Sequence, residues 1–137
     1  MSDKRTGPVS VIYKKFYTDD TGKHISDTFS DLSVNHVNVK HLWESTVDGF
    51  YSTDHTNYFT CLAGDLRIVI ANEVDNAYKF NQYFISDFDG KIIKIKPYTW
   101  FAVHNLGSDS AVIMNGTDSI GSVNRLSSKI FDWHSKR

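Results

Sequence analysis

The chain has 137 residues, a net charge of −1 and a single cysteine, Cys61. This charge provides no basic field for nucleic acid or an anionic membrane surface, and no apolar run approaches the ~20 residues that span a bilayer. One cysteine excludes an internal disulfide and is typical of a reducing compartment. Because the first residues contain no apolar leader, we expect a cytoplasmic protein.

Short β-type runs follow one another along the chain, and no long segment keeps helical periodicity. Residues 63–65, 87–90 and 106–110 predict turns, since they combine Gly with Asp or Ser between apolar runs. The spacing is typical of an all-β sandwich or barrel. The predicted strands are residues 9–17, 34–43, 58–62, 66–71, 81–85, 91–95, 100–106 and 111–115.

The length fits one domain, residues 1–137, with a barrel core at about 34–118 and a C-terminal tail at 119–137. Aromatic residues make up 14% of the chain, a share that suits the pleated, half-buried surface of strands. Phe131 and Trp133 in the tail are large apolar side chains near a terminus, so we expect them to cover the barrel mouth or a partner subunit.

Residues 90–105, GKIIKIKPYTWFAVHN, resemble the second sequence motif of the cupin barrels. Pro97 and Asn105 stand at the motif's positions, and Phe101 occupies the position of its His. The resemblance implies an all-β fold, a cupin-type jelly-roll β-barrel (double-stranded β-helix). It also implies a homodimer, formed by the exchange or extension of edge strands such as 9–17.

A longer stretch, from about residue 39 to 118, is similar to the cupin branch of the dTDP-4-dehydrorhamnose 3,5-epimerases and dTDP-sugar 3,4-ketoisomerases. Gly49-Phe50 matches a Gly-aromatic turn of that branch, and Gly64 matches its hairpin. Trp100, His104 and the loop at 108–109 are in register with its second half. The resemblance implies an isomerase acting on a dTDP-4-keto-6-deoxyhexose in cell-envelope polysaccharide synthesis.

The residues that would bind a metal in a cupin are replaced. Phe101 takes the place of the second-motif His, and Tyr51, Thr53 and Asn57 fall near the first-motif positions. A divalent ion needs three or four N or O ligands, so we expect a barrel without metal or other cofactor. The epimerase branch is itself metal-free, and this expectation is compatible with it.

Epimerisation or ketoisomerisation next to a carbonyl needs a base, an acid and a group that stabilises the enolate. Histidine suits the base and tyrosine the acid. The catalytic candidates are His55, Tyr51 and His104, and Tyr51 stands where the branch has its catalytic His. If Asp54 and His55 lie in a loop, both can face the mouth. The candidates for substrate contact are Tyr58, Asn57, Lys94, Arg67, Phe101 and Asn105.

Several of these residues have a structural interpretation as well. His104 alternates with Val103 and Asn105, which places it away from Phe101 in an outer layer. Lys94 belongs either to a solvated strand face or to an anion site, and Arg67 either to an outer salt bridge or to a phosphate site.

Three functions follow from these alternatives. The first is a nucleotide-sugar epimerase or isomerase, supported by the organisation of the chain. The second is a non-catalytic cupin that binds a sugar or sugar nucleotide, supported by the two replaced His positions. The third is a structural or interaction barrel with no small ligand. The first two have a small-molecule nucleotide sugar as partner.

Overall fold

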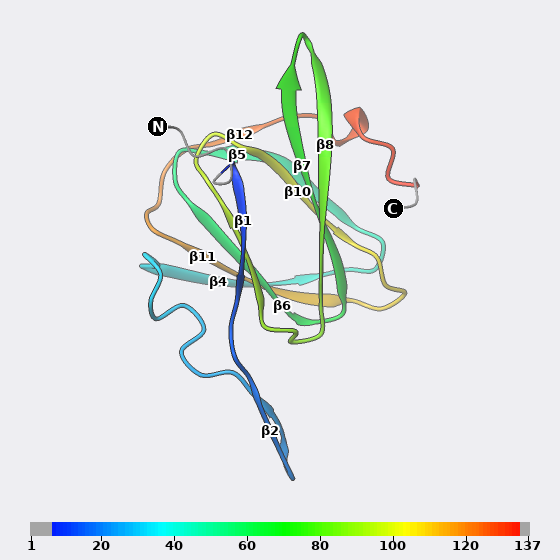
Figure 1. Cartoon of the computed structure of the whole chain (residues 1–137). Helices are drawn as coiled ribbons and strands as arrows, with labels where there is room; N and C mark the ends of the chain where they lie inside the picture. Colours follow the sequence, from blue (N-terminus) through cyan, green and yellow to red (C-terminus); the bar gives the residue numbers. More distant parts are fainter. Residues whose placement is uncertain (1–6, 135–137) are drawn as a thin grey trace.

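The structure, a computed structural model, describes residues 7–134. Ten strands form two five-stranded antiparallel sheets that face each other, and β2 and β3 form a separate hairpin (Figure 1). The first sheet has the order β1-β9-β6-β11-β4, and the second has the order β12-β5-β10-β7-β8. The elements are β1 (Val9–Tyr13), β2 (Tyr17–Asp19), β3 (Gly22–His24), β4 (His36–Leu42), β5 (Val47–Thr53), β6 (Asn57–Ala63), β7 (Asp65–Val74), β8 (Ala77–Ser86), β9 (Lys91–Ile95), β10 (Trp100–Asn105), β11 (Ala111–Thr117), β12 (Val123–Arg125) and the 3-10 helix η2 (Ser128–Ile130).

The all-β prediction is confirmed, and each predicted strand overlaps an observed one. The predicted run 9–17 divides into β1 and the start of β2, and β7 and β8 are longer than predicted. β1 pairs with β9 of the same chain, Val9 opposite Ile95. The three predicted turns join β6 to β7, β8 to β9 and β10 to β11.

The prediction missed β5, the strand that carries Asp48, Tyr51 and Thr53 of the cavity described below. Its sequence begins with Val47, Asp48 and Gly49, and Asp and Gly are both depleted in strands. Gly49 has φ +138°, and a Cβ there would lie 2.7 Å from the Cα of Ala102. Glycine is therefore required where β5 approaches β10, and the register between these two strands shifts at that point.

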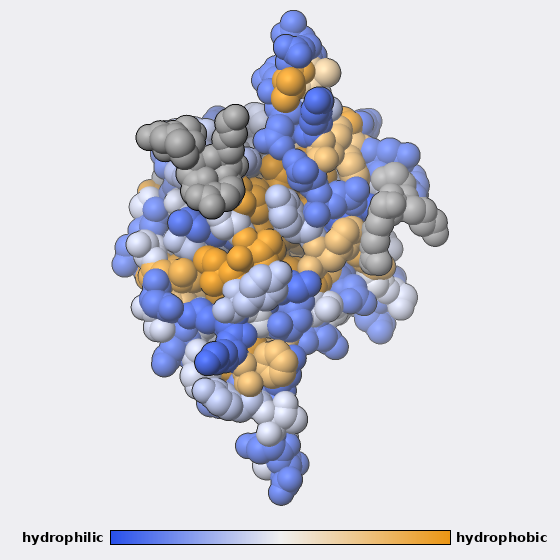
Figure 2. Space-filling view, in the orientation of Figure 1, coloured by the Kyte–Doolittle hydropathy of each residue, from blue (hydrophilic) through white to orange (hydrophobic). Residues whose placement is uncertain are grey.

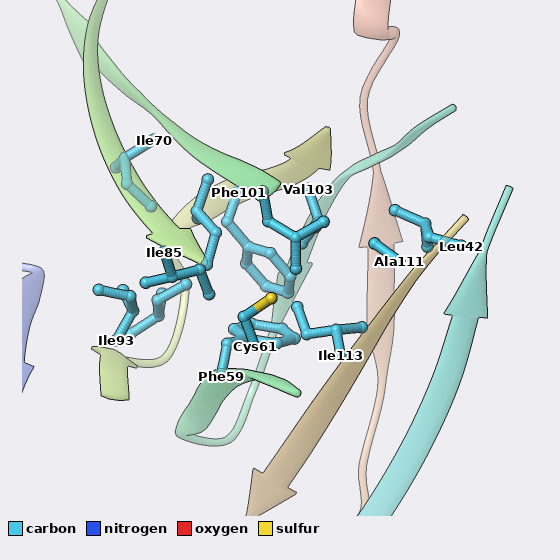
Figure 3. Close-up of a cluster of buried hydrophobic side chains, with 13 residues drawn as sticks. Leu42, Phe59, Cys61, Ile70, Ile85, Ile93, Phe101, Val103, Ala111 and Ile113 are labelled. Atoms are coloured by element: carbon cyan, nitrogen blue, oxygen red, sulfur yellow. The ribbon is translucent and has the colours of Figure 1, made fainter. Parts of the chain in front are cut away.

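The main hydrophobic core lies between the two sheets. Figure 3 shows Phe101 and Val103 of β10 pointing toward Cys61, Phe59 and Ile113 of the opposite sheet. Burial of each large apolar side chain contributes about 1.5–3 kcal/mol. Burial also raises the pKa of the Cys61 thiol to about 12, so this cysteine is a core residue rather than a nucleophile.

The C-terminal tail forms a second core on the outer face of the second sheet. The ring of Trp133 lies 5.7 Å from that of Phe50, and the ring of Phe131 lies 4.9 Å from that of Phe80. Val69 and Ala102 are buried beneath them. Phe131 and Trp133 thus cover the back of the sheet and not the mouth, which corrects one of the two expected locations.

The surface divides into apolar and hydrophilic regions. Figure 2 shows an apolar area across the barrel body, while the two projecting hairpins, β2–β3 and β7–β8, are mostly hydrophilic. Within residues 7–134, no helix has the length and apolar character needed to cross a membrane.

Candidate functional site

A cavity of about 360 Å³ lies between the two sheets. Strands of both sheets contribute to it, so its walls are built on rigid elements rather than on loops alone. The lining residues are Asn38, Lys40, Leu42, Asp48, Tyr51, Thr53, His55, Asn57, Phe59, Phe101, Val103, Ile113, Asn115, Val123 and Arg125.

His55 lines this cavity and is paired with Asp54, which does not line it. They lie in the short loop between β5 and β6, where the chain no longer alternates, and His55 Nδ1 is 3.0 Å from Asp54 Oδ1. The hydrogen bond from His55 lowers the pKa of the Asp54 carboxyl. An ionised Asp54 can only accept in this hydrogen bond, so Nδ1 of His55 carries a proton, and whenever the ring is neutral its lone pair is on Nε2. No described residue hydrogen-bonds to Nε2.

A network of hydrogen bonds fixes the loop that carries this pair. Thr53 Oγ1 donates to the carbonyl of His55 at 2.8 Å, and Asn57 Nδ2 donates to Thr53 Oγ1 at 2.8 Å. The amide of Thr56 donates to Asp118 Oδ1 at 3.0 Å. His55 is only 8% exposed, so its ring is held in place while it lines the cavity.

A second polar group lines the cavity around Tyr51. The Tyr51 hydroxyl donates to Asp48 Oδ1 at 2.5 Å, and Lys40 Nζ lies 2.7 Å from Asp48 Oδ2. The guanidinium carbon of Arg125 lies 5.2 Å from the centre of the Tyr51 ring. The hydrogen bond to Asp48, with burial, raises the pKa of the Tyr51 phenol. Tyr51 is therefore protonated at neutral pH, beside two cationic side chains.

Apolar side chains form the inner part of the cavity. Phe59 and Phe101 have ring centres 5.3 Å apart, and Phe101 stands where the cupin motif has a metal-binding His. Across residues 7–134, no three His, Cys, Asp or Glu side chains come together as a metal site. The cavity thus combines an aromatic floor with polar groups from both sheets, a composition common in ligand pockets.

Four of the predicted site residues share this cavity: His55, Tyr51, Asn57 and Phe101. Five do not line it: His104, Tyr58, Lys94, Arg67 and Asn105.

His104 and Arg67 lie on the outer face of the second sheet, under the tail. Arg67 Nη2 is 2.9 Å from His104 Nδ1 and donates to the carbonyl of Trp133 at 2.9 Å, while Nη1 donates to Gln82. Burial, and secondarily the charge of Arg67, lowers the pKa of His104. Both residues thus join the tail to the sheet.

The other three predicted site residues that lie outside the cavity are Tyr58, Lys94 and Asn105. Tyr58 is buried on the outer side of β6 against Phe29, and the Lys94 ammonium lies 6.0 Å from its ring centre. Asn105 Nδ2 donates to the carbonyls of Leu42, Trp43 and Asp109, which connects β10 to two neighbouring loops. Strand alternation is the cause for Tyr58 and Lys94, since neighbours such as Tyr58 and Phe59 point to opposite faces. Asn105 has the same parity as Val103 and lies outside the cavity because it ends β10.

The sequence prediction missed several polar residues of the cavity, among them Lys40, Asp48 and Arg125. Lys40 alternates with valines on β4, a pattern that predicts buried valines and a solvated lysine; the structure has the reverse, with Val37 and Val39 exposed and Lys40 at the cavity. Asp48 lies on the strand that was not predicted. Arg125 lies on β12, only three residues long, which nothing in the tail's sequence marks as a strand.

This chain resembles known proteins in its structure but not detectably in its sequence. No family model and no curated protein matches the sequence. Among solved structures, the dTDP-4-dehydrorhamnose 3,5-epimerase of Sulfolobus tokodaii aligns with a TM-score of 0.77 and 13% identity, over 95% of this chain and 83% of the epimerase. A dTDP sugar isomerase of Desulfovibrio desulfuricans aligns at 0.78 and 14%, over 96% and 94%. The chain has the cupin fold of the dTDP-sugar epimerases and isomerases.

The sugar 3,4-ketoisomerase QdtA of Thermoanaerobacterium thermosaccharolyticum, solved in complex with TDP, aligns with a TM-score of 0.72 and 14% identity. The alignment covers 90% of this chain and 92% of QdtA. Each of the three alignments covers at least 90% of this chain, and the likeness confirms the predicted jelly-roll fold.

Proposed function

We propose that this cupin is a metal-independent epimerase or isomerase of a nucleotide-linked 4-keto-6-deoxyhexose, with a dTDP sugar as the preferred substrate class. The observation that carries the proposal is His55 in the wall of a cavity between the sheets, with Asp54 hydrogen-bonded to it. The fold likeness to dTDP-sugar epimerases and isomerases supports the substrate class.

His55 is the base in this proposal. The proton on the carbon next to the keto group moves to Nε2, and the C–H electron pair forms an enolate whose charge rests on the former carbonyl oxygen. Asp54 stabilises the imidazolium that results, because its carboxylate accepts the Nδ1 proton. In an epimerisation, an acid on the opposite face of the sugar protonates the same carbon, and the proton on His55 is released to water. In a ketoisomerisation, the proton of the neighbouring hydroxyl moves to the enolate oxygen, and His55 returns its proton to the former carbonyl carbon.

Tyr51 and the cations beside it complete the site. Tyr51 retains its proton at neutral pH, since its pKa is raised. Its single phenolic hydrogen is donated to Asp48 in this structure, so Tyr51 acts as an acid toward the reacting sugar once the substrate oxygen replaces Asp48 as the acceptor. Lys40 and Arg125 supply positive charge for the diphosphate and for the enolate. The neighbouring QdtA structure contains TDP, which supports a diphosphate ligand for this fold.

Deuterium exchange tests the proposal directly. In deuterated water, the full-length protein should introduce deuterium at C3 or C5 of dTDP-4-keto-6-deoxyglucose, detected as a mass increase and by loss of the proton NMR signal. dTDP-glucose is the matched control, since it lacks the keto group that makes the neighbouring C–H acidic. Absence of exchange at any protein concentration contradicts an epimerase or isomerase.

A non-catalytic sugar-nucleotide binder is the second candidate. It is favoured by one observation, namely that Tyr51 stands where the resemblance places the catalytic His. Thermal stabilisation by TDP or the keto sugar, without exchange, supports this candidate. Neither stabilisation nor exchange supports a structural barrel.

The cellular setting of the site is part of the same proposal. The resemblance to the cupin branch supports a homodimer and a role in polysaccharide biosynthesis, and the single cysteine and the lack of an apolar leader in the first residues support a cytoplasmic location. Light scattering at micromolar concentration tests the dimer, and a monomer would contradict it.

A further inference from the structure

The segment that follows the last long strand closes over the loop carrying Asp54 and His55. β11 ends at Thr117, and the chain then crosses to pair with β5 as β12. Val123 lies opposite Thr53 in this pairing. Residues 118–122 therefore lie beside the Asp54–His55 pair, although they are more than sixty positions away in the sequence.

Three contacts hold this segment against the pair. Ser122 Oγ donates to Asp54 Oδ2 at 3.3 Å, and the Asp54 amide donates to the Ser122 carbonyl at 3.4 Å. Asp118 Oδ1 accepts from the amide of Thr56, the residue after His55. Asp54 is thus held from one side by His55 and from the other by this segment.

Gly121 is the point of closest approach. A Cβ on Gly121 would lie 2.0 Å from Asp54 Oδ1 and 2.7 Å from its Cγ and Oδ2. The oxygen nearest to that Cβ is the one that accepts the Nδ1 proton of His55. A side chain at position 121 and the observed Asp54 carboxylate therefore cannot occupy the same space.

We infer that Gly121 is a positioning residue for the Asp54–His55 pair. Its lack of a side chain lets residues 118–122 lie against the Asp54 carboxylate and hold it on His55 Nδ1. The consequence for catalysis rests on the proposed function, whereas the geometry of the pair does not.

Replacement of Gly121 isolates this effect from general destabilisation. The three atoms nearest to the added Cβ all belong to the Asp54 carboxylate, the free end of a side chain that can rotate away. At Gly49 and Gly90, by contrast, the added Cβ meets backbone atoms at 2.7 Å or less. Gly121→Ala should therefore leave the barrel folded while it displaces the carboxylate. Gly7→Ala is the matched control, since nothing lies within 4 Å of its Cβ.

The test compares isotope-labelled wild type, G121A and G7A in full-length protein by NMR. In G121A the Asp54 carboxyl should titrate at higher pH than in wild type, and the His55 Nδ1 proton should exchange with water at least ~10-fold faster. Exchange of deuterium into the keto sugar should fall roughly 10- to 100-fold, less than the ~10⁴-fold loss known when the Asp behind a catalytic His is replaced, because Asp54 is displaced and not removed. G7A should match wild type in all three measurements.

An unchanged Asp54 titration and an unchanged Nδ1 proton in G121A would overturn the inference. If G121A fails to fold, Ser122→Ala carries the test, since it removes one exposed hydrogen bond to Asp54 and should raise the Asp54 titration midpoint by a smaller amount. If wild type catalyses no exchange, the proposed function fails, and the NMR result still decides the role of Gly121.

Discussion

His55 and His104 are held on opposite sides of the second sheet by partners of opposite charge. His55 donates to the Asp54 carboxylate in the wall of the cavity. His104 accepts from the Arg67 guanidinium beneath the Trp133 ring, with the ring centres 5.3 Å apart. Burial and the Arg67 guanidinium lower the pKa of His104, and this histidine joins the tail to the sheet. His55 instead has a carboxylate partner, which would stabilise the imidazolium formed if it takes a proton from substrate.

The largest expected effect is the loss of deuterium exchange when His55 is replaced. His55→Asn should lower deuterium exchange into the keto sugar roughly 10²- to 10⁴-fold, because it removes the general base. His104→Gln, measured per folded molecule, should leave the exchange rate within a few-fold of wild type. Equal losses in the two variants would show that the cavity geometry does not distinguish the two histidines.

The next effect concerns the stability of the outer face. Trp133→Ala should lower the free energy of unfolding by about 2–3 kcal/mol, somewhat below the range for a fully buried Trp because this side chain is half-buried. The pKa of His104 should rise toward its ordinary value, since burial is the main cause of its lowering. Chemical denaturation and NMR titration measure the two quantities. A stability within 0.5 kcal/mol of wild type, roughly the range of a surface change, would mean that the tail does not anchor there.

Charge at the mouth should contribute a smaller amount to ligand binding. Arg125→Gln should weaken TDP binding roughly tenfold, or about 1.4 kcal/mol, by removing a cation that lines the cavity. Lys94→Gln is the matched control, because Lys94 is also cationic and does not line the cavity. Calorimetry measures both affinities, and an equal weakening would indicate a general charge effect.

The pH dependence of the unfolding free energy tests the environment of His104. Below about pH 6.5 the unfolded chain takes up a proton on His104 that the folded chain does not, because the folded-state pKa is lowered. The unfolded state then binds more protons, so stability decreases as pH falls through this range. His104→Gln should show a shallower decrease when unfolding is followed at a series of pH values. If the free energy of unfolding has the same pH dependence in wild type and in His104→Gln, His104 does not cause the loss of stability at low pH.

The smallest effect concerns Tyr51. Asp48→Asn should lower the pKa of the Tyr51 phenol, since the hydrogen bond to Asp48 is the main cause of its raised value. The difference in phenolate absorbance between D48N and wild type measures the change, and Tyr51→Phe in both backgrounds identifies the signal. No shift would mean that Asp48 does not control the Tyr51 proton.

Local pattern predicted much of the fold and part of the site. Alternating apolar runs and Gly-containing turns indicated most strands, because burial on one face imposes a period of two. The resemblance to the cupin motifs indicated His55, Tyr51, Asn57 and Phe101 as site candidates, and these four line one cavity. Strand β5 escaped prediction because Gly49 satisfies a close approach to Ala102, a constraint from a strand fifty residues away.

The sequence by itself determined the all-β class, the main turns and the residues near the cupin motif positions, since these depend on periodicity and on residues close together in the chain. The tertiary structure alone decided that Arg67 and His104 lie under the tail, that Lys40 and Arg125 face the cavity, and that Gly121 lies against Asp54. The physical reason is that contacts between distant segments depend on how the sheets pair and on the path of the tail. Neither follows from the local pattern of polar and apolar residues.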